Sequence, residues 1–261
     1  MPLKMGVQVI RKALLKLKEN DCLDKFFVTL DAPSIKIAFK TTVGKQQKLK
    51  ETLETELTDK GSESYSFDSF FFKEGFLGNE PNDFPQEFFF MDDLSALTID
   101  ILSESEISRD FIFLYALYLH FGWIKIRNMI DKESIADIIL KGYCWFNISN
   151  VTQEKRQALE TSFAENEDYI SECYSTVMSM DATVLSKTPS WFKSWLEMCV
   201  ERLHANTALF FNEEYQVEMS YFLIPSLINK HLGISGDELT RQIYYINMAV
   251  LSKSTAGTSI E

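Results

Sequence analysis

The first 60 residues carry three successive patterns of apolar and polar positions. In VQVIRKALLKLKEN, apolar residues recur every three or four positions with basic residues between them, which predicts an amphipathic helix. Residues 26–30 and 34–40 are rich in β-branched and aromatic side chains and flank a turn of Asp, Ala and Pro, so they predict a β-hairpin. Residues 45–61 have helical composition with leucines spaced by four. We therefore expect an N-terminal lobe of helix, hairpin and helix at residues 1–60.

Residues 61–95 interrupt this periodicity, because Ser, Asp, Phe, Gly and Pro are frequent there. Turn signals around Gly75 and Pro85 exclude one long helix, so this Phe-rich acidic segment is the expected boundary. Helical periodicity then dominates, and we expect a helical domain at residues 96–252. The small polar residues 253–261 predict a flexible tail. The expected fold class is α+β and predominantly α-helical.

Within the helical domain, local signals place several helix ends. Thr152 has the side chain and position of a helix N-cap, and Gly233 is a natural stop. Ser235 and Glu238 have the spacing of a capping box that opens the last helix. The longest apolar run, residues 111–124, is too short for a bilayer span and contains a histidine, so we expect a buried core helix and no membrane span.

Charge is distributed unevenly along the chain. The net charge is -12, yet residues 1–60 hold 12 Lys and Arg against 8 Asp and Glu. The remaining residues hold 14 basic and 30 acidic side chains. Such an acidic body repels phosphate backbones, which disfavours nucleic acid and favours a protein partner, or simply provides solubility. The basic face of the first helix fits either a solvated surface over a small sheet or contact with a membrane or an acidic partner.

No pattern of residues indicates catalysis or a metal site. The four cysteines form no C-x-x-C pair, and the three histidines are not paired at helical spacing, so each reads as a structural side chain. The glycine motifs for phosphate, dinucleotides and a nucleophile elbow are missing. The acidic pairs Asp92–Asp93 and Glu213–Glu214 are typical of a solvated surface. We expect a protein that is not an enzyme and has no cofactor.

The stretch FDSFFFKEGFLGNEPNDFPQEFFFMDD is the candidate partner-binding site. Its aromatic residues fit a buried core, since large exposed apolar surface is rare on a monomer. They also fit a binding hot spot inside an acidic rim. We expect a division in which one set of Phe residues lies between the N-terminal lobe and the helical domain, and a smaller set contacts a partner. The residues proposed for partner contact are Phe70, Phe72, Phe88, Phe90, Asp92 and Asp93.

Residues 28–54 resemble the N-terminal segment of small baseplate hub and tail-assembly proteins of T-even-type contractile-tailed bacteriophages. The resemblance is carried by Pro33, Ser34, Ile35, Ile37, Phe39, Lys40, Thr42, Val43 and Lys48. Near the C-terminus, MSYFLIPSLINKHLGISGDEL is similar to phage tail-assembly chaperones through Leu232, Gly233, Ile234, Asp237 and Glu238. Together the two stretches cover about a fifth of the chain.

This resemblance implies a non-enzymatic role in building the baseplate hub, through contacts with other hub or tail proteins, in the virion or in the cytoplasm of the bacterial host. Oligomerisation within such an assembly is left open. The alternative is an acidic inhibitor or immunity-type protein that neutralises a basic protein partner. The two differ in salt dependence, because electrostatic association slows as ionic strength rises whereas an apolar assembly contact changes little.

Overall fold

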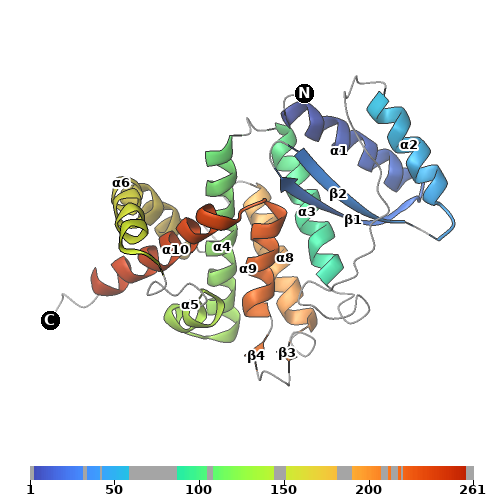
Figure 1. The fold of residues 1–261 in the computed structure, drawn as a ribbon. Coiled ribbons are helices and arrows are strands. Elements are labelled where there is room, and N and C mark those ends of the chain that lie inside the picture. Colours follow the sequence, from blue (N-terminus) through green and yellow to red (C-terminus); the bar gives the residue numbers. More distant parts are fainter. Residues whose placement is uncertain are drawn as a thin grey trace. The chain divides into compact units, whose positions relative to one another are not determined.

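The computed structural model describes residues 3–31, 34–41, 43–58, 87–104, 108–143, 151–180, 190–206, 211–212, 217–218 and 220–256. The chain divides into two compact units, Met1–Ser108 and Arg109–Glu261. The chain is mostly helical and has a small two-stranded antiparallel sheet in its first unit (Figure 1), which confirms the predominantly helical α+β class.

In its described residues, the N-terminal unit contains three helices and one hairpin. Its elements are α1 (Leu3–Glu19), β1 (Leu23–Asp31), β2 (Ser34–Thr41), α2 (Gln46–Thr58) and α3 (Glu87–Glu104). The apolar stripe of α1 is buried, with Val7 and Leu17 fully inaccessible. The helix ends where Asp21 takes a left-handed conformation (φ 53°), which lets the amide of Cys22 donate to the carbonyl of Leu17 at 2.9 Å. Strand β1 begins at Leu23, earlier than the aromatic run from residue 26 predicts.

The hairpin pairs β1 and β2 in antiparallel register, and α1 and α3 pack against β1 (Figure 1). Phe26, Val28 and Leu30 of β1 are buried and lie opposite Phe39, Ile37 and Ile35 of β2, which are half-buried. Of the two strands of the hairpin, β1 is therefore the one that is buried, and β2 stays partly exposed.

Side chains of α3 bind the edge of β1 that faces away from β2. The amide of Phe26 donates to the Oδ1 atom of Asp92, and the amide of Val28 donates to the hydroxyl of Ser95, each at 3.0 Å. An edge strand normally leaves such amides open to another strand. Because α3 occupies these donors, the β1 edge of the hairpin is closed.

Replacing Ser95 by alanine is expected to leave the fully buried Val28 amide without this acceptor and to lower the free energy of unfolding by about 1–3 kcal/mol. Hydrogen exchange at the Val28 amide measures the effect directly. Ser103→Ala is the matched control, since the Ser103 hydroxyl is also on α3 but donates to a carbonyl of its own helix, that of Asp100. Equal protection of Val28 in the two variants would contradict the assigned contact.

Helix α3 joins the N-terminal unit as a whole, although the sequence places residues from 96 onward in the helical domain. The reason is its contacts, since α3 packs on α1 as well as on β1 and the division follows Ser108. The Phe-rich segment also becomes helical from Glu87, within the expected boundary region 61–95. At the other end of the chain, the last helix continues to Ala256, into the expected tail.

The C-terminal unit is built around one central helix. Its elements are α4 (Arg109–Asp131), α5 (Ile135–Tyr143), α6 (Gln153–Met178), α8 (Ser190–Asn206), β3 (Phe211–Asn212), β4 (Val217–Glu218), α9 (Ser220–His231) and α10 (Gly236–Ala256). Helix α4 contacts α5, α6, α8, α9 and α10 (Figure 1). This position explains the apolar run at 111–124, which is a buried core helix. No helix in the described part of the chain is both long and apolar enough for a bilayer span.

A close contact joins α4 to α8 at Gly122. The indole of Trp195 is fully buried, and its Nε1 atom donates to the carbonyl of Leu119 at 3.0 Å. A β-carbon at position 122 would lie 2.9 Å from two atoms of that indole and 3.1 Å from the ring of Phe192. Glycine therefore lets α8 approach the backbone of α4.

The corner between α9 and α10 is held by Arg109, the first residue of α4. Its guanidinium donates to the carbonyls of Leu232 (3.2 Å) and Gly233 (2.9 Å) and pairs with the carboxylate of Glu238. Gly233 is left-handed (φ 65°), as the helix stop predicted from the sequence requires. The carboxylate of Glu238, predicted to complete a capping box with Ser235, binds Arg109 instead.

Candidate functional site

The predicted partner site maps only in part onto the described structure. Phe70 and Phe72 lie outside the described residues, and Phe88 and Phe90 belong to the first turn of α3, where only the backbone is described. Asp92 and Asp93 follow in the same helix and are half-buried.

Asp92 has an internal partner, the amide of Phe26 described above. A half-buried carboxylate that accepts a hydrogen bond from a strand edge holds α3 against β1. The structure therefore gives this residue of the predicted acidic rim a role inside the N-terminal unit.

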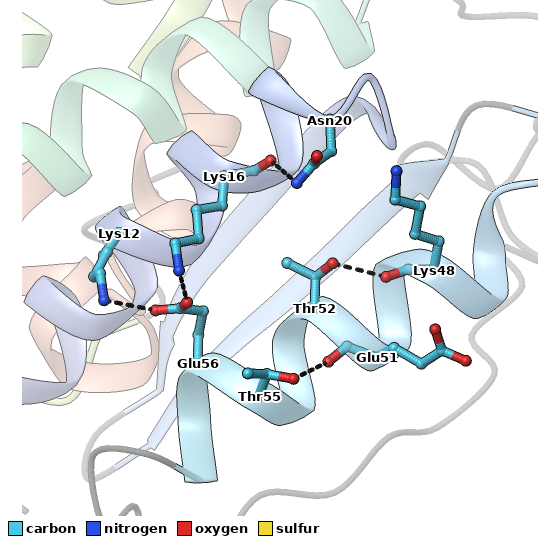
Figure 2. A network of polar contacts seen from close by, with 8 residues as sticks. All are labelled: Lys12, Lys16, Asn20, Lys48, Glu51, Thr52, Thr55 and Glu56. Carbon is cyan, nitrogen blue, oxygen red and sulfur yellow. Dashed lines mark hydrogen bonds and ion pairs between the residues drawn. The ribbon is translucent and has the colours of Figure 1, made fainter.

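The basic face of α1 is also used within the N-terminal unit. Lys12 and Lys16 both reach the carboxylate of Glu56 on α2 (Figure 2), with 3.0 Å from the Nζ atom of Lys12. On the other side of α1, the Nε atom of Arg11 lies 2.7 Å from the Oδ1 atom of Asp100 on α3. These three bases hold α2 and α3 to α1.

The Glu56 carboxylate is covered by the side chains around it, with only 5% of the side chain exposed. Hydrogen bonds from Lys16 and then Lys12 lower its pKa, against the opposing effect of burial. The carboxylate consequently stays ionised down to a lower pH than a free glutamate, and it offsets one of the two lysine charges.

A different charged surface lies on α6 in the C-terminal unit. Thr152 caps this helix as predicted, accepting from the amide of Lys155 at 3.3 Å. A single apolar stripe that runs from Leu159 to Val177 is buried, so most of the helix circumference faces solvent. We define the α6 acidic face by its exposed carboxylates and one aromatic residue: Glu160, Glu165, Glu167, Asp168, Tyr169 and Glu172.

The carboxylates of the α6 acidic face are in no ion pair within the part of the chain that the structure describes. Residues 157–180 contain no lysine or arginine, and within the described residues none of the five carboxylates takes part in an ion pair. The only basic residues of α6 are Lys155 and Arg156 in its first turn, and Lys155 pairs with Asp237 of α10. The face thus carries net negative charge toward solvent.

Tyr169 gives this face an aromatic centre. Its side chain is 47% exposed, and burial of the remainder together with the neighbouring Cys173 raises the pKa of the phenol. Glu165 and Glu172 lie four residues before it and three after it, on the same side of the helix. A tyrosine that is anchored on one edge, neutral and flanked by two carboxylates can serve as an aromatic anchor for a partner.

This face is not among the sites predicted from the sequence, although its signal is local. A helix with five acidic residues and no basic residue over 24 positions is visible in the sequence itself. What the sequence cannot show is which aromatic residue of the chain lies exposed among the acids.

The C-terminal unit also contains a buried polar cluster. His120 of α4 is fully inaccessible, with its Nδ1 atom 2.9 Å from the hydroxyl of Tyr143 and its Nε2 atom 3.1 Å from the Oδ1 atom of Asn229. These partners fit a neutral ring in which Nε2 donates to the amide oxygen and Nδ1 accepts from the tyrosine. Both ring nitrogens therefore have hydrogen-bond partners inside the unit, as expected of a histidine with a structural role.

The remaining histidines, the second acidic pair and the cysteines are either buried or outside the described residues. His231 is buried, whereas the side chain of His204 and the pair Glu213–Glu214 lie outside the described set. Among the residues that the structure describes, no three His, Cys, Asp or Glu side chains come together as metal ligands. Cys22, Cys173 and Cys199 are buried free thiols.

Comparison with protein-family models, with curated proteins and with solved structures finds no match to this chain.

Proposed function

We propose that this protein is a non-enzymatic binding component whose partner is another protein, and that the α6 acidic face is the surface that contacts it. The observation that carries the proposal is the set of five exposed carboxylates on α6, two of them beside Tyr169, none of which is in an ion pair within the described residues. On α1, by contrast, Arg11, Lys12 and Lys16 pair with Asp100 and Glu56. The partner chemistry that fits is a basic surface with an apolar pocket for the tyrosine ring.

The more specific form of the proposal is a component of a phage tail baseplate hub, or a chaperone of tail assembly. It is supported by the two stretches that resemble such proteins. The first spans the end of β1, all of β2 and most of α2, and the second spans α9 and the start of α10. In this form the helix, hairpin and helix of residues 1–60 act as one lobe, and the protein works in the virion or in the cytoplasm of the bacterial host.

Co-expression with the hub and tail proteins of the same phage tests the specific form. Co-purification of one of them, and impaired tail assembly when the gene is deleted, is the expected result. Intact tails in the deletion strain together with no co-purified protein would refute it.

The double variant Glu165→Lys/Glu172→Lys tests the surface. It reverses two charges beside Tyr169, and we expect the dissociation constant for the captured partner to rise at least tenfold, about 1.4 kcal/mol. Glu19→Lys/Glu201→Lys makes the same change of net charge at exposed positions of α1 and α8 and should leave binding unchanged. Equal weakening by the two variants would mean that total charge, and not the α6 acidic face, determines binding.

The same face also favours the alternative, an acidic inhibitor or immunity-type protein. Stopped-flow association at increasing salt separates the two. A rate that falls steeply with ionic strength favours electrostatic neutralisation of a basic target. A rate that changes little favours an assembly contact centred on Tyr169.

A further inference from the structure

The outer edge of β2 is not paired by any strand among the residues that the structure describes. In the antiparallel ladder, amides point alternately toward the partner strand and away from it. The amides of Phe26 and Val28 point away from β2, toward α3, so their cross-strand partners Phe39 and Ile37 must likewise point away from β1. Within the described residues no strand pairs with that outer edge. The hairpin therefore has one closed edge and one open edge.

The side chains of β2 carry a pattern that matches itself. Ile35, Ile37 and Phe39 alternate with Lys36 and Ala38, and the three apolar side chains are half-buried. Two such strands can pair antiparallel about Ile37, which places Ile35 of each copy opposite Phe39 of the other. The same register places each Lys36 opposite an Ala38, so no two lysines are directly opposed.

From this register we propose that β2 is a homodimerisation edge, at which two copies of the chain join their hairpins into one four-stranded antiparallel sheet. Ile35, Ile37 and Phe39 then exchange main-chain hydrogen bonds across the two-fold axis, and their exposed apolar surface is covered by the same residues of the second copy. The contact is isologous, which limits the assembly to a closed dimer. The β2 edge and the α6 acidic face are different surfaces, so an experiment that refutes one proposal does not affect the other.

Sedimentation over a range of concentrations measures the dimer in the full-length protein, and the wild type should dimerise. Ile37→Lys places two lysines together on the two-fold axis and should raise the dimer dissociation constant at least tenfold. Val43→Lys is the control, because Val43 is 97% exposed just beyond β2 and adds the same charge outside the pairing. A monomeric wild type, or a dimer that persists in Ile37→Lys, overturns the proposal.

Cysteine cross-linking tests the register directly. In a hydrogen-bonded antiparallel pair the two Cα atoms at position 37 lie about 5.5 Å apart, within disulfide range. Ile37→Cys should cross-link under mild oxidation. Ile35→Cys should not, because position 35 of the second copy lies about 13 Å away along the strand. Cross-linking of both variants, or of neither, contradicts pairing about Ile37, and the oxidised wild type controls for the native cysteines.

Discussion

Trp195→Ala is expected to lower the free energy of unfolding of the C-terminal unit by about 4 kcal/mol. The indole is fully buried between α8 and α4, so its removal leaves a large cavity. It also removes the hydrogen bond to the carbonyl of Leu119. Urea denaturation monitored by far-ultraviolet circular dichroism measures the loss, and a change under about 1 kcal/mol would contradict the assigned packing.

The contact with Gly122 gives this prediction a second test. Gly122→Ala places a methyl group 2.9 Å from the indole, and we expect overpacking of about 1–3 kcal/mol to outweigh the gain of about 1 kcal/mol in helix propensity. In the Trp195→Ala background the same substitution should be neutral or stabilising, because the methyl group then enters the cavity. This reversal of sign separates steric contact from a general intolerance of the helix to change.

Acidification below neutral pH is expected to destabilise the C-terminal unit through His120. Burial, which outweighs the hydrogen bond with Asn229, lowers the pKa of His120 from 6.5 to about 4. Between these two values the unfolded chain binds a proton that the folded unit excludes, so stability is complete above pH 6.5 and decreases as the pH falls toward 4. The full loss is about 3 kcal/mol, of which about 2 kcal/mol accrues between about pH 7.5 and pH 5.

The free energy of unfolding measured at several pH values checks this, in comparison with His120→Gln. The variant should be less stable at neutral pH but should lose less stability between about pH 7.5 and pH 5. That window lies above the range in which Glu56 contributes, because the lowered pKa of Glu56 makes its stabilisation disappear only at more acid pH. Parallel pH profiles for the two proteins would show that His120 is not the titrating group.

The elements that local sequence determines could be predicted, and those that depend on distant partners could not. Thr152 caps α6 and Gly233 follows α9, since a cap or a left-handed turn depends on a few adjacent residues. The placement of α3 depends on Asp92 and Ser95 reaching amides 66 and 67 residues earlier in the chain, which no local pattern records. Residue type alone made Asp92 a candidate for an outward acidic rim.

The candidate site shows the same limit. Residues 157–180 reveal their charge imbalance directly in the sequence, so the acidity of α6 could have been predicted. The exposure of Tyr169 could not, because the packing of the unit decides that nearly half of this residue stays accessible. Likewise, the basic face of α1 is evident from periodicity, but the pairing of Lys12 and Lys16 with Glu56 requires α2 to lie alongside.

The hydrogen bonds and ion pair of Arg109 with the corner between α9 and α10 have a consequence for folding during synthesis. Its partners lie 123 to 129 residues later in the chain, and α10 also packs on α4, α5 and α6. The C-terminal unit therefore cannot close around α4 until its last helix has left the ribosome. The N-terminal unit is compact by itself and precedes the other in the chain, so it can fold while the rest is still being translated. Until then the part of α4 that α10 covers stays exposed.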